Sequence, residues 1–348
     1  MIPDDSTNHQ LPSGIVADVF GEVNVMRSGD SMEVSFTILK VPDGEEAEGY
    51  QTGVALDGSS SMKNSYGYSM QGDIPPEAVA EYREKGWINR KFVDGKQRTS
   101  LAAVAQADAI ERGFLTRSPN LLEPIARELI EFLADGLDDD GGTTVIYWSC
   151  GEDGGDIQVL GDVTGEECAT LVIEGPRGGK SFGNGTKLKP AMKYFADRFD
   201  DAPNGIYVFI TDGSLDDFEE VKQYTTELAR DIYSGNRNPL KFVLIGLGED
   251  INSEQLEELD DLDPGVPVDI WDHKIAEEMR QLEEIFAEVV NENEILFPPA
   301  TIHDSTGAVV KNLPGGVPAK VDFEISAESE YFELRCEGAS IRQGLDLG

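Results

Sequence analysis

A short apolar run that ends in an aspartate constrains the fold of this chain more than any other feature. Residues 53–56 are apolar, and Asp57, Gly58 and three serines follow them. A run of this kind is typical of a strand buried on both faces of a parallel sheet. In open α/β sheets, ligands bind beyond the C-terminal ends of the strands. Asp57, Ser59 and Ser61 therefore fall where a binding site is expected, and their oxygens are ligands that hard cations prefer.

Two further segments could complete such a site. Residues 206–210 form a second apolar run, which ends in Thr211 and Asp212. Gly185 and Thr186 lie in a glycine-rich loop that precedes an amphipathic helix predicted at residues 188–199. Neighbouring parallel strands end at the same edge of a sheet, so these segments are expected to meet there.

The ordered set D-x-S-x-S, G-T and T-D-G resembles the metal-ion-dependent adhesion site of von Willebrand factor A (VWA) domains. The resemblance covers residues 50–293 and implies a doubly wound, mostly parallel, Rossmann-like α/β sheet. It implies that Ser59, Ser61 and Thr186 touch the metal directly, whereas Asp57 and Asp212 hold it through waters and hydrogen bonds. We expect Mg²⁺, with Mn²⁺ or Ca²⁺ as alternatives. The T-D-G-S strand end is more similar to bacterial tellurium-resistance-type and copine-like domains than to integrin domains.

A site of this composition favours recognition over hydrolysis. Three neutral hydroxyls and two mostly indirect carboxylates leave Mg²⁺ under-neutralised, so it attracts an Asp or Glu side chain of a partner. We therefore predict a non-enzymatic adaptor. The resemblance implies a bacterial or archaeal stress-response or defence assembly, with a partner such as a chaperone-like ATPase. The alternatives are a metal-dependent phosphoester hydrolase at the same strand ends, or a structural or oligomer subunit whose metal locks the fold.

Composition limits the partners and the compartment. The net charge of −39 repels nucleic acid and anionic membrane surfaces. This acid excess has two possible explanations. One is an adaptation for solubility or high salt, and the other is a surface that binds a basic partner. No apolar run is long enough to span a membrane, and no signal peptide is visible. The three cysteines are far apart in the sequence. This spacing fits neither a disulfide framework nor a zinc site, so we expect a reducing cytoplasm.

The two ends of the chain have strand-like patterns that differ from the alternating strands and helices between them. After a flexible tail predicted at residues 1–12, strands are expected within residues 13–48 and again within residues 294–348. We expect these strands to combine into one accessory β-sandwich around the α/β region. The alternative is that the N-terminal strands extend the α/β sheet as an edge hairpin. Within the α/β region, a helix is predicted from Ser118, a strand at residues 266–270 and a long helix at residues 275–290.

Residues 63–117 form an insertion relative to the VWA pattern, in which a helix follows the serines closely. Helices are predicted at residues 76–85 and 100–112. Residues 82–99 are a basic, aromatic island in an acidic chain; its cations are Arg83, Lys85, Arg90, Lys91, Lys96 and Arg98. This island is either a cationic rim for an acidic partner or a means of neutralising nearby acids within the fold.

Overall fold

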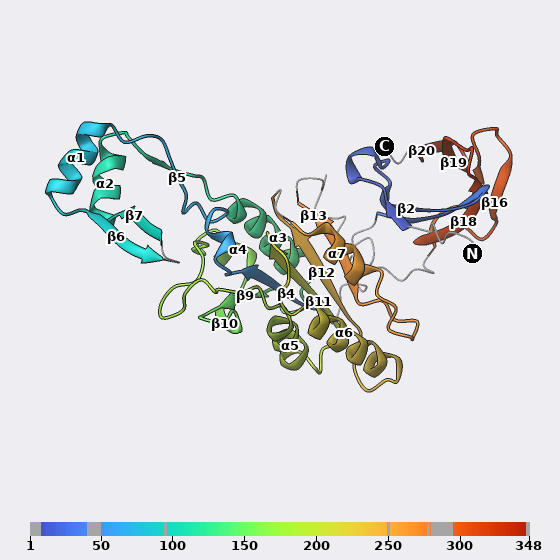
Figure 1. Cartoon of the computed structure of the whole chain (residues 1–348). Helices are drawn as coiled ribbons and strands as arrows, with labels where there is room; N and C mark the ends of the chain where they lie inside the picture. The colour runs from blue at the N-terminus through green and yellow to red at the C-terminus, as the bar shows by residue number, and fades with distance from the viewer. Residues whose placement is uncertain are drawn as a thin grey trace, which may run out of the picture.

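The fold is seen in a computed structural model that describes residues 8–39, 50–93, 96–248, 251–276, 279 and 295–345. Figure 1 shows an elongated chain, with a helix-covered sheet in the middle, a small α/β insertion at one end and a pair of sheets at the other. The chain is thus a mixed α/β protein with several antiparallel sheets. None of the helices in these described residues is long and apolar enough to cross a membrane.

The central sheet has six strands in the order β10-β9-β4-β11-β12-β13. All neighbours are parallel except β10, which runs antiparallel to β9. The strands are β4 (Tyr50–Asp57), β9 (Thr143–Cys150), β10 (Asp156–Val163), β11 (Asn204–Thr211), β12 (Leu240–Gly246) and β13 (Trp271–Ile275). Because β4, β9 and β11 are neighbours, their C-terminal ends lie at one edge of the sheet.

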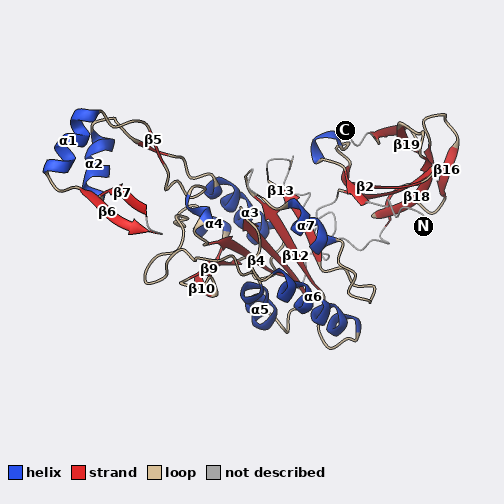
Figure 2. Cartoon of the chain, in the orientation of Figure 1, coloured by secondary structure: helices blue, strands red, loops and turns tan. Residues whose placement is uncertain are grey.

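Helices pack on both faces of this sheet, as Figure 2 also shows. Val54 and Leu56 of β4 point to one face, where they join a core with α3 (Leu122–Gly136) and α4 (Gly165–Cys168). Ala55 points to the other face, because successive strand residues alternate. The helices on that face are α5 (Lys189–Arg198), α6 (Phe218–Tyr233) and α7 (Ser253–Asp260). Burial on both faces explains why the strands are apolar throughout.

Two sequence predictions differ in detail from the structure, and a third lies outside the part of the chain that the structure describes. The helix predicted from Ser118 begins at Leu122, and the side chain of Asn120 accepts a hydrogen bond of 3.0 Å from the backbone of Glu123 in place of a serine cap. The last strand of the central sheet is β13 (Trp271–Ile275), whereas the sequence predicted a strand at residues 266–270. The long helix predicted at residues 275–290 lies almost entirely outside the described residues.

Strands from the two ends of the chain share one sheet, in the order β1-β2-β3-β18. Its strands are β1 (Asn8–Gln10), β2 (Phe20–Ser28), β3 (Ser31–Ile38) and β18 (Lys320–Ser326), so residues 8–10 of the predicted tail are paired. A second sheet packs on it and contains β15 (Ala300–His303), β16 (Val309–Leu313), β19 (Tyr331–Cys336) and β20 (Ala339–Gly344). Phe36 of the first sheet stacks on Phe332 of the second at 5.4 Å between ring centroids. A short pair, β14 (Ile295–Phe297) with β17 (Val317–Pro318), lies beside them.

The insertion forms a small body with its own core. Its elements are β5 (Met70–Gln71), α1 (Pro76–Glu84), β6 (Ile88–Val93), β7 (Lys96–Leu101), α2 (Ala103–Glu111) and β8 (Thr116–Arg117). Both predicted helices are present, whereas the β6–β7 hairpin between them was not predicted. The core centres on Tyr82, with Ala78, Ala105, Ala109 and Leu115 around it. The β5–β8 pair joins this body to the central sheet (Figure 1).

Candidate metal site at the edge of the central sheet

Asp57 is the last residue of β4, and its side chain is fully buried. Its Oδ1 atom accepts a hydrogen bond of 2.7 Å from the backbone N–H of Ser59. Its Oδ2 atom accepts one of 2.7 Å from the hydroxyl of Thr211, at the end of the neighbouring strand β11. Both carboxylate oxygens are thereby fixed, and all of these donors are neutral.

The two predicted hydroxyl ligands of the first motif lie together. The Oγ atoms of Ser59 and Ser61 are 2.8 Å apart. Ser59 is buried, whereas Ser61 is exposed at the start of a 3-10 turn. The pair therefore reaches from the buried Asp57 towards solvent, as a ligand set for an accessible cation must.

The glycine-rich loop is joined to the serine loop by its backbone. The N–H of Ser60 donates to the carbonyl of Gly183 at 2.8 Å, and the N–H of Gly183 donates to the carbonyl of Gly58 at 2.8 Å. This pairing brings the loop that carries Thr186 to the same edge of the sheet. The backbone N–H of Thr186 donates to Asp216 Oδ2 at 2.9 Å, which fixes the loop.

Asp212 follows β11 directly, and the parallel register of Ile210 with Leu56 places it beside the end of β4. The pKa of Asp57 is raised to about 7, first by burial and also by the negative charge of Asp212, against hydrogen bonds that lower it. The two predicted carboxylates are thus close enough to repel each other. A cation between them would relieve that repulsion.

The end of β9 also shapes the site, which the sequence did not indicate. Ser149 has a positive φ of 51°, an uncommon conformation for a residue with a side chain. Its hydroxyl accepts a hydrogen bond of 2.8 Å from the backbone of Lys187, next to Thr186. A Cβ atom on Gly183 would lie 2.0 Å from the carbonyl of Ser149, so only glycine permits this approach.

Three more residues, which the metal-site prediction did not include, hold the site together. The hydroxyl of Tyr66 donates to the carbonyl of Asp57 at 3.0 Å. Asp217 accepts backbone hydrogen bonds from the first residues of the α5 segment, Leu188 at 2.9 Å and Lys189 at 3.0 Å. Asp216 and Asp217 are visible in the sequence as an acidic pair after the T-D-G-S motif. Their roles depend on tertiary contacts across about 30 residues, with separations of 28 to 30 for these bonds.

The residues present fit a hard divalent cation. Asp57 is a fully buried carboxylate that forms no ion pair with a described Lys, Arg or His. Such a burial is costly unless a cation compensates it. No group of three or more His, Cys, Asp or Glu residues is gathered as a ready metal cluster within the described ranges. The donors here are mainly serine and threonine hydroxyls, which is a different ligand set, and their oxygens suit Mg²⁺ better than a softer metal.

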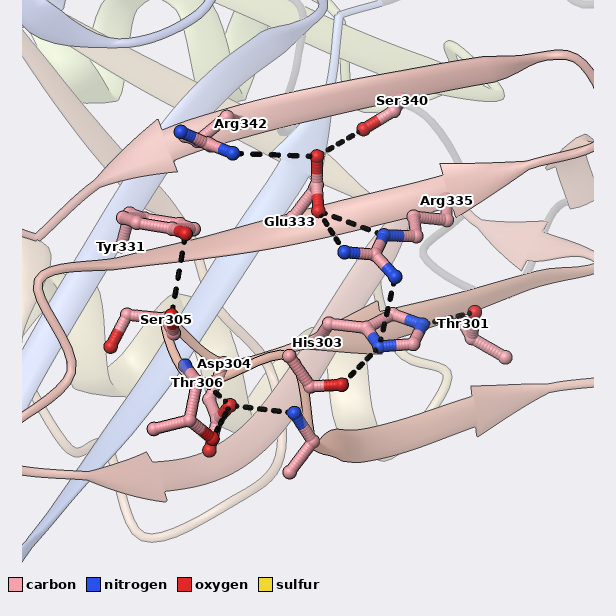
Figure 3. Close-up of polar contacts among 12 residues, drawn as sticks. Thr301, His303, Asp304, Ser305, Thr306, Tyr331, Glu333, Arg335, Ser340 and Arg342 are labelled. Carbon is pink, nitrogen blue, oxygen red and sulfur yellow. Dashed lines mark hydrogen bonds and ion pairs between the residues drawn. The ribbon is translucent and has the colours of Figure 1, made fainter.

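A second polar network lies on the sheet of the β-sandwich that contains β15, β16, β19 and β20 (Figure 3). Glu333 accepts from Arg335 at 2.8 Å and lies 3.8 Å from Arg342. His303 bonds Thr301 at 2.9 Å and the carbonyl of Gly307 at 3.0 Å. The charges in this network compensate each other on the exposed face, so it presents no uncompensated ligand.

Comparison with known proteins leaves the site to be interpreted from its own geometry. The chain matches no protein-family model, and no curated protein matches its sequence.

Proposed function

We propose that this chain is a non-enzymatic, Mg²⁺-dependent protein-binding module of the VWA type. In this proposal Ser59, Ser61 and Thr186 contact the metal, while Asp57 and Asp212 act through waters and charge. The observation that carries it is the meeting of the serine loop, the glycine loop and the end of β11 around a buried carboxylate that accepts hydrogen bonds from neutral groups. The finer assignment of the sheet as doubly wound is supported by its helices on both faces.

The chemistry of the bound ion explains why recognition is proposed. Mg²⁺ takes about six oxygens and loses water reluctantly. Neutral hydroxyls leave most of its positive charge uncompensated, so an Asp or Glu side chain of a partner protein is the ligand that the site selects. A cytoplasmic stress-response or defence assembly, with an ATPase among the partners, is the setting that the VWA resemblance favours.

Thermal unfolding with and without Mg²⁺ tests the site directly. A ligand at 100 times its Kd stabilises the folded state by about 2.7 kcal/mol, so saturating Mg²⁺ should raise the melting temperature and EDTA should reverse the rise. Ser59→Ala should abolish the response. Ser60→Ala is the matched control, because Ser60 contacts the glycine loop through its backbone.

Three results would oppose the proposal. An equal response in Ser59→Ala and wild type would place any bound metal elsewhere. Hydrolysis of p-nitrophenyl phosphate that disappears in Asp57→Asn would favour a hydrolase. A Mg²⁺ response without any increase in affinity for a carboxylate-bearing peptide would favour a metal that only locks the fold.

A further inference from the structure

A cavity of about 320 Å³ lies between the β-sandwich and the edge of the central sheet. One wall is formed by residues 9–12 and by Asn24 of β2. The other is formed by α7 and by β13, the edge strand of the central sheet (Figure 1). Small-molecule sites usually measure about 300–1,000 Å³, whereas a single water takes about 30 Å³. The cavity is therefore large enough for a small organic ligand.

The wall formed by α7 carries a row of side-chain oxygens. Ser253, Glu257 and Asp260 line the cavity and follow one another at spacings of four and three residues, which places them on one face of the helix. With a rise of 1.5 Å per residue, the row is about 10 Å long. A line of acceptors of this length suits an extended ligand better than a compact one.

The acids of this row lie at the end of the helix that favours cations. Glu257 and Asp260 belong to the last turn of α7, which contains no basic residue, and Asp261 lines the cavity directly after it. The C-terminal end of a helix carries a partial negative charge, so it attracts cations and disfavours carboxylates. A positively charged ligand in the cavity is thus attracted both by the carboxylates and by the helix end.

The cations among the described lining residues compensate these acids only in part. His273 Nδ1 lies 3.1 Å from Asp260 Oδ2, yet burial still raises the pKa of Asp260 above its usual value. The charged form of this carboxyl is therefore not fully supported by the imidazole. Lys274 also lines the cavity, but its ammonium group is held by Glu22 and Asp272. The described lining is net negative.

The rest of the lining suits an alkyl chain rather than an anion or a metal ion. Pro12 and Ile275 provide apolar surface, and the amide of Asn24 can accept a hydrogen bond. An anion would be repelled by the carboxylates. Within the described ranges, no group of three or more His, Cys, Asp or Glu residues is gathered for a metal ion. Methylene groups between ammonium groups match an apolar surface beside a row of acids.

We propose that this cavity binds an aliphatic polyamine, a linear alkyl chain with several ammonium groups. Its ammonium groups pair with Glu257 and Asp260, and its methylene groups lie on Pro12 and Ile275. The ligand touches both walls and therefore joins the β-sandwich to the central sheet. A lysine side chain of a partner protein offers the same chemistry through a single ammonium group, so the test includes it.

Isothermal titration calorimetry of the full chain with spermidine tests the proposal. A salt concentration of about 0.15 M screens exposed charges beyond about 8 Å, and divalent cations are left out. We expect Glu257→Gln to weaken binding about tenfold, because it removes a charge-assisted hydrogen bond. Glu258→Gln is the matched control on the same helix: Glu258 pairs with Lys222 at 2.6 Å and does not line the cavity, so this variant should bind as wild type does. Octanediol, an uncharged chain of similar length, should not bind.

A substitution on the opposite wall tests whether the two walls share the ligand. Asn24→Leu removes a neutral hydrogen-bonding group from the sandwich side and should weaken spermidine binding about threefold. Glu257→Gln should fold, because Glu257 is exposed and the loss of a carboxylate near a helix C-terminus is favourable. Its melting temperature without ligand should therefore not fall, and spermidine should raise it less than it raises that of wild type.

Three outcomes would overturn the proposal. Equal weakening in Glu257→Gln and Glu258→Gln would show diffuse attraction of a polycation to a chain with a net charge of −39. Wild-type affinity in Asn24→Leu would show that the sandwich wall takes no part in binding. Equal affinity for spermidine and for acetyl-lysine methylamide would assign the cavity to a lysine side chain of a partner protein.

Discussion

The Thr211 hydroxyl donates a hydrogen bond of 2.7 Å to Asp57 Oδ2, and this bond joins the ends of β11 and β4 at the candidate site. Both residues are fully buried. Because Asp57 has no described cationic side chain as an ion-pair partner, the orientation of its carboxylate depends on this bond and on the Ser59 N–H. The same contact therefore stabilises the sheet and positions the site.

Replacing Thr211 with valine should keep the shape of the side chain and remove the donor. Hydrogen bonds to charged groups contribute about 1.5–3 kcal/mol, so Thr211→Val should lower the free energy of unfolding by about 2 kcal/mol in urea titrations with EDTA. Thr226→Val is the control, since that hydroxyl bonds only the carbonyl of Lys222 in its own helix, at 3.0 Å. Equal losses in the two variants would show that the Asp57 bond has no special role.

A methyl group at Gly183 should separate the serine and glycine loops. The added Cβ would lie 2.0 Å from the carbonyl of Ser149, which is backbone and cannot move aside cheaply. Overpacking of this kind costs about 1–3 kcal/mol, and we expect Gly183→Ala to reach the upper end of that range and to lose the Mg²⁺-dependent rise in melting temperature. Gly142→Ala is the control, because the nearest atom to its Cβ would be 3.8 Å away. If both variants respond to Mg²⁺ as wild type does, the loop pairing is not needed for the site.

His273 should make stability depend on pH. Its Nδ1 atom lies 3.1 Å from Asp260 Oδ2, beside a cavity of about 320 Å³ that both residues line. Burial lowers the pKa of His273, but the bond to Asp260 and the charges of Asp260, Glu257 and Asp261 outweigh it and raise the pKa above 6.5. The folded protein therefore holds this proton more tightly than the unfolded chain. The resulting stabilisation is complete below pH 6.5 and is lost as the pH rises through the raised pKa.

Melting temperatures measured between about pH 6 and pH 8 check this dependence. Wild type should lose stability as the pH rises, and His273→Gln should give a flatter profile. Asp260→Asn should flatten it as well, because the shift then loses its main cause. Unchanged slopes in both variants would mean that other groups control the profile.

Local sequence patterns predicted the centre of the α/β sheet. Its strands are apolar runs, which become buried in the fold whichever elements pack against them. The predicted strand at residues 206–210 is confirmed within β11 (Asn204–Thr211). By contrast, β13 was misplaced because its sequence contains Asp272, His273 and Lys274, which usually indicate a surface loop. The buried Lys274 pairs with Glu22, 252 residues earlier in the chain, and no local pattern carries that information.

The candidate site was predictable to a similar extent. Asp57, Ser59, Ser61, Thr186 and Asp212 each stand at a predicted strand end or loop, and the structure brings their segments to one edge. The contributions of Ser149 and Asp216 were not predictable, because each acts through a contact with the glycine loop more than 29 residues away. Metal binding itself stays a prediction.

Lys274 should be the most sensitive charged position at the boundary between the β-sandwich and the central sheet. Its side chain is 3% exposed and forms ion pairs with Glu22 of β2 and with Asp272 of its own strand. Lys274→Met would leave both carboxylates buried without this cation, which costs about 3–5 kcal/mol in comparable cases.

Because Glu22 belongs to the sandwich, calorimetry should also show separate unfolding of the two parts. Lys180→Met is the control, since Lys180 pairs at 2.8 Å with Asp156 and both side chains are exposed, so its loss should matter by about 1 kcal/mol or less. Adding Glu22→Gln to Lys274→Met should restore part of the loss, whereas no recovery, with a single transition retained, would contradict this account of the boundary.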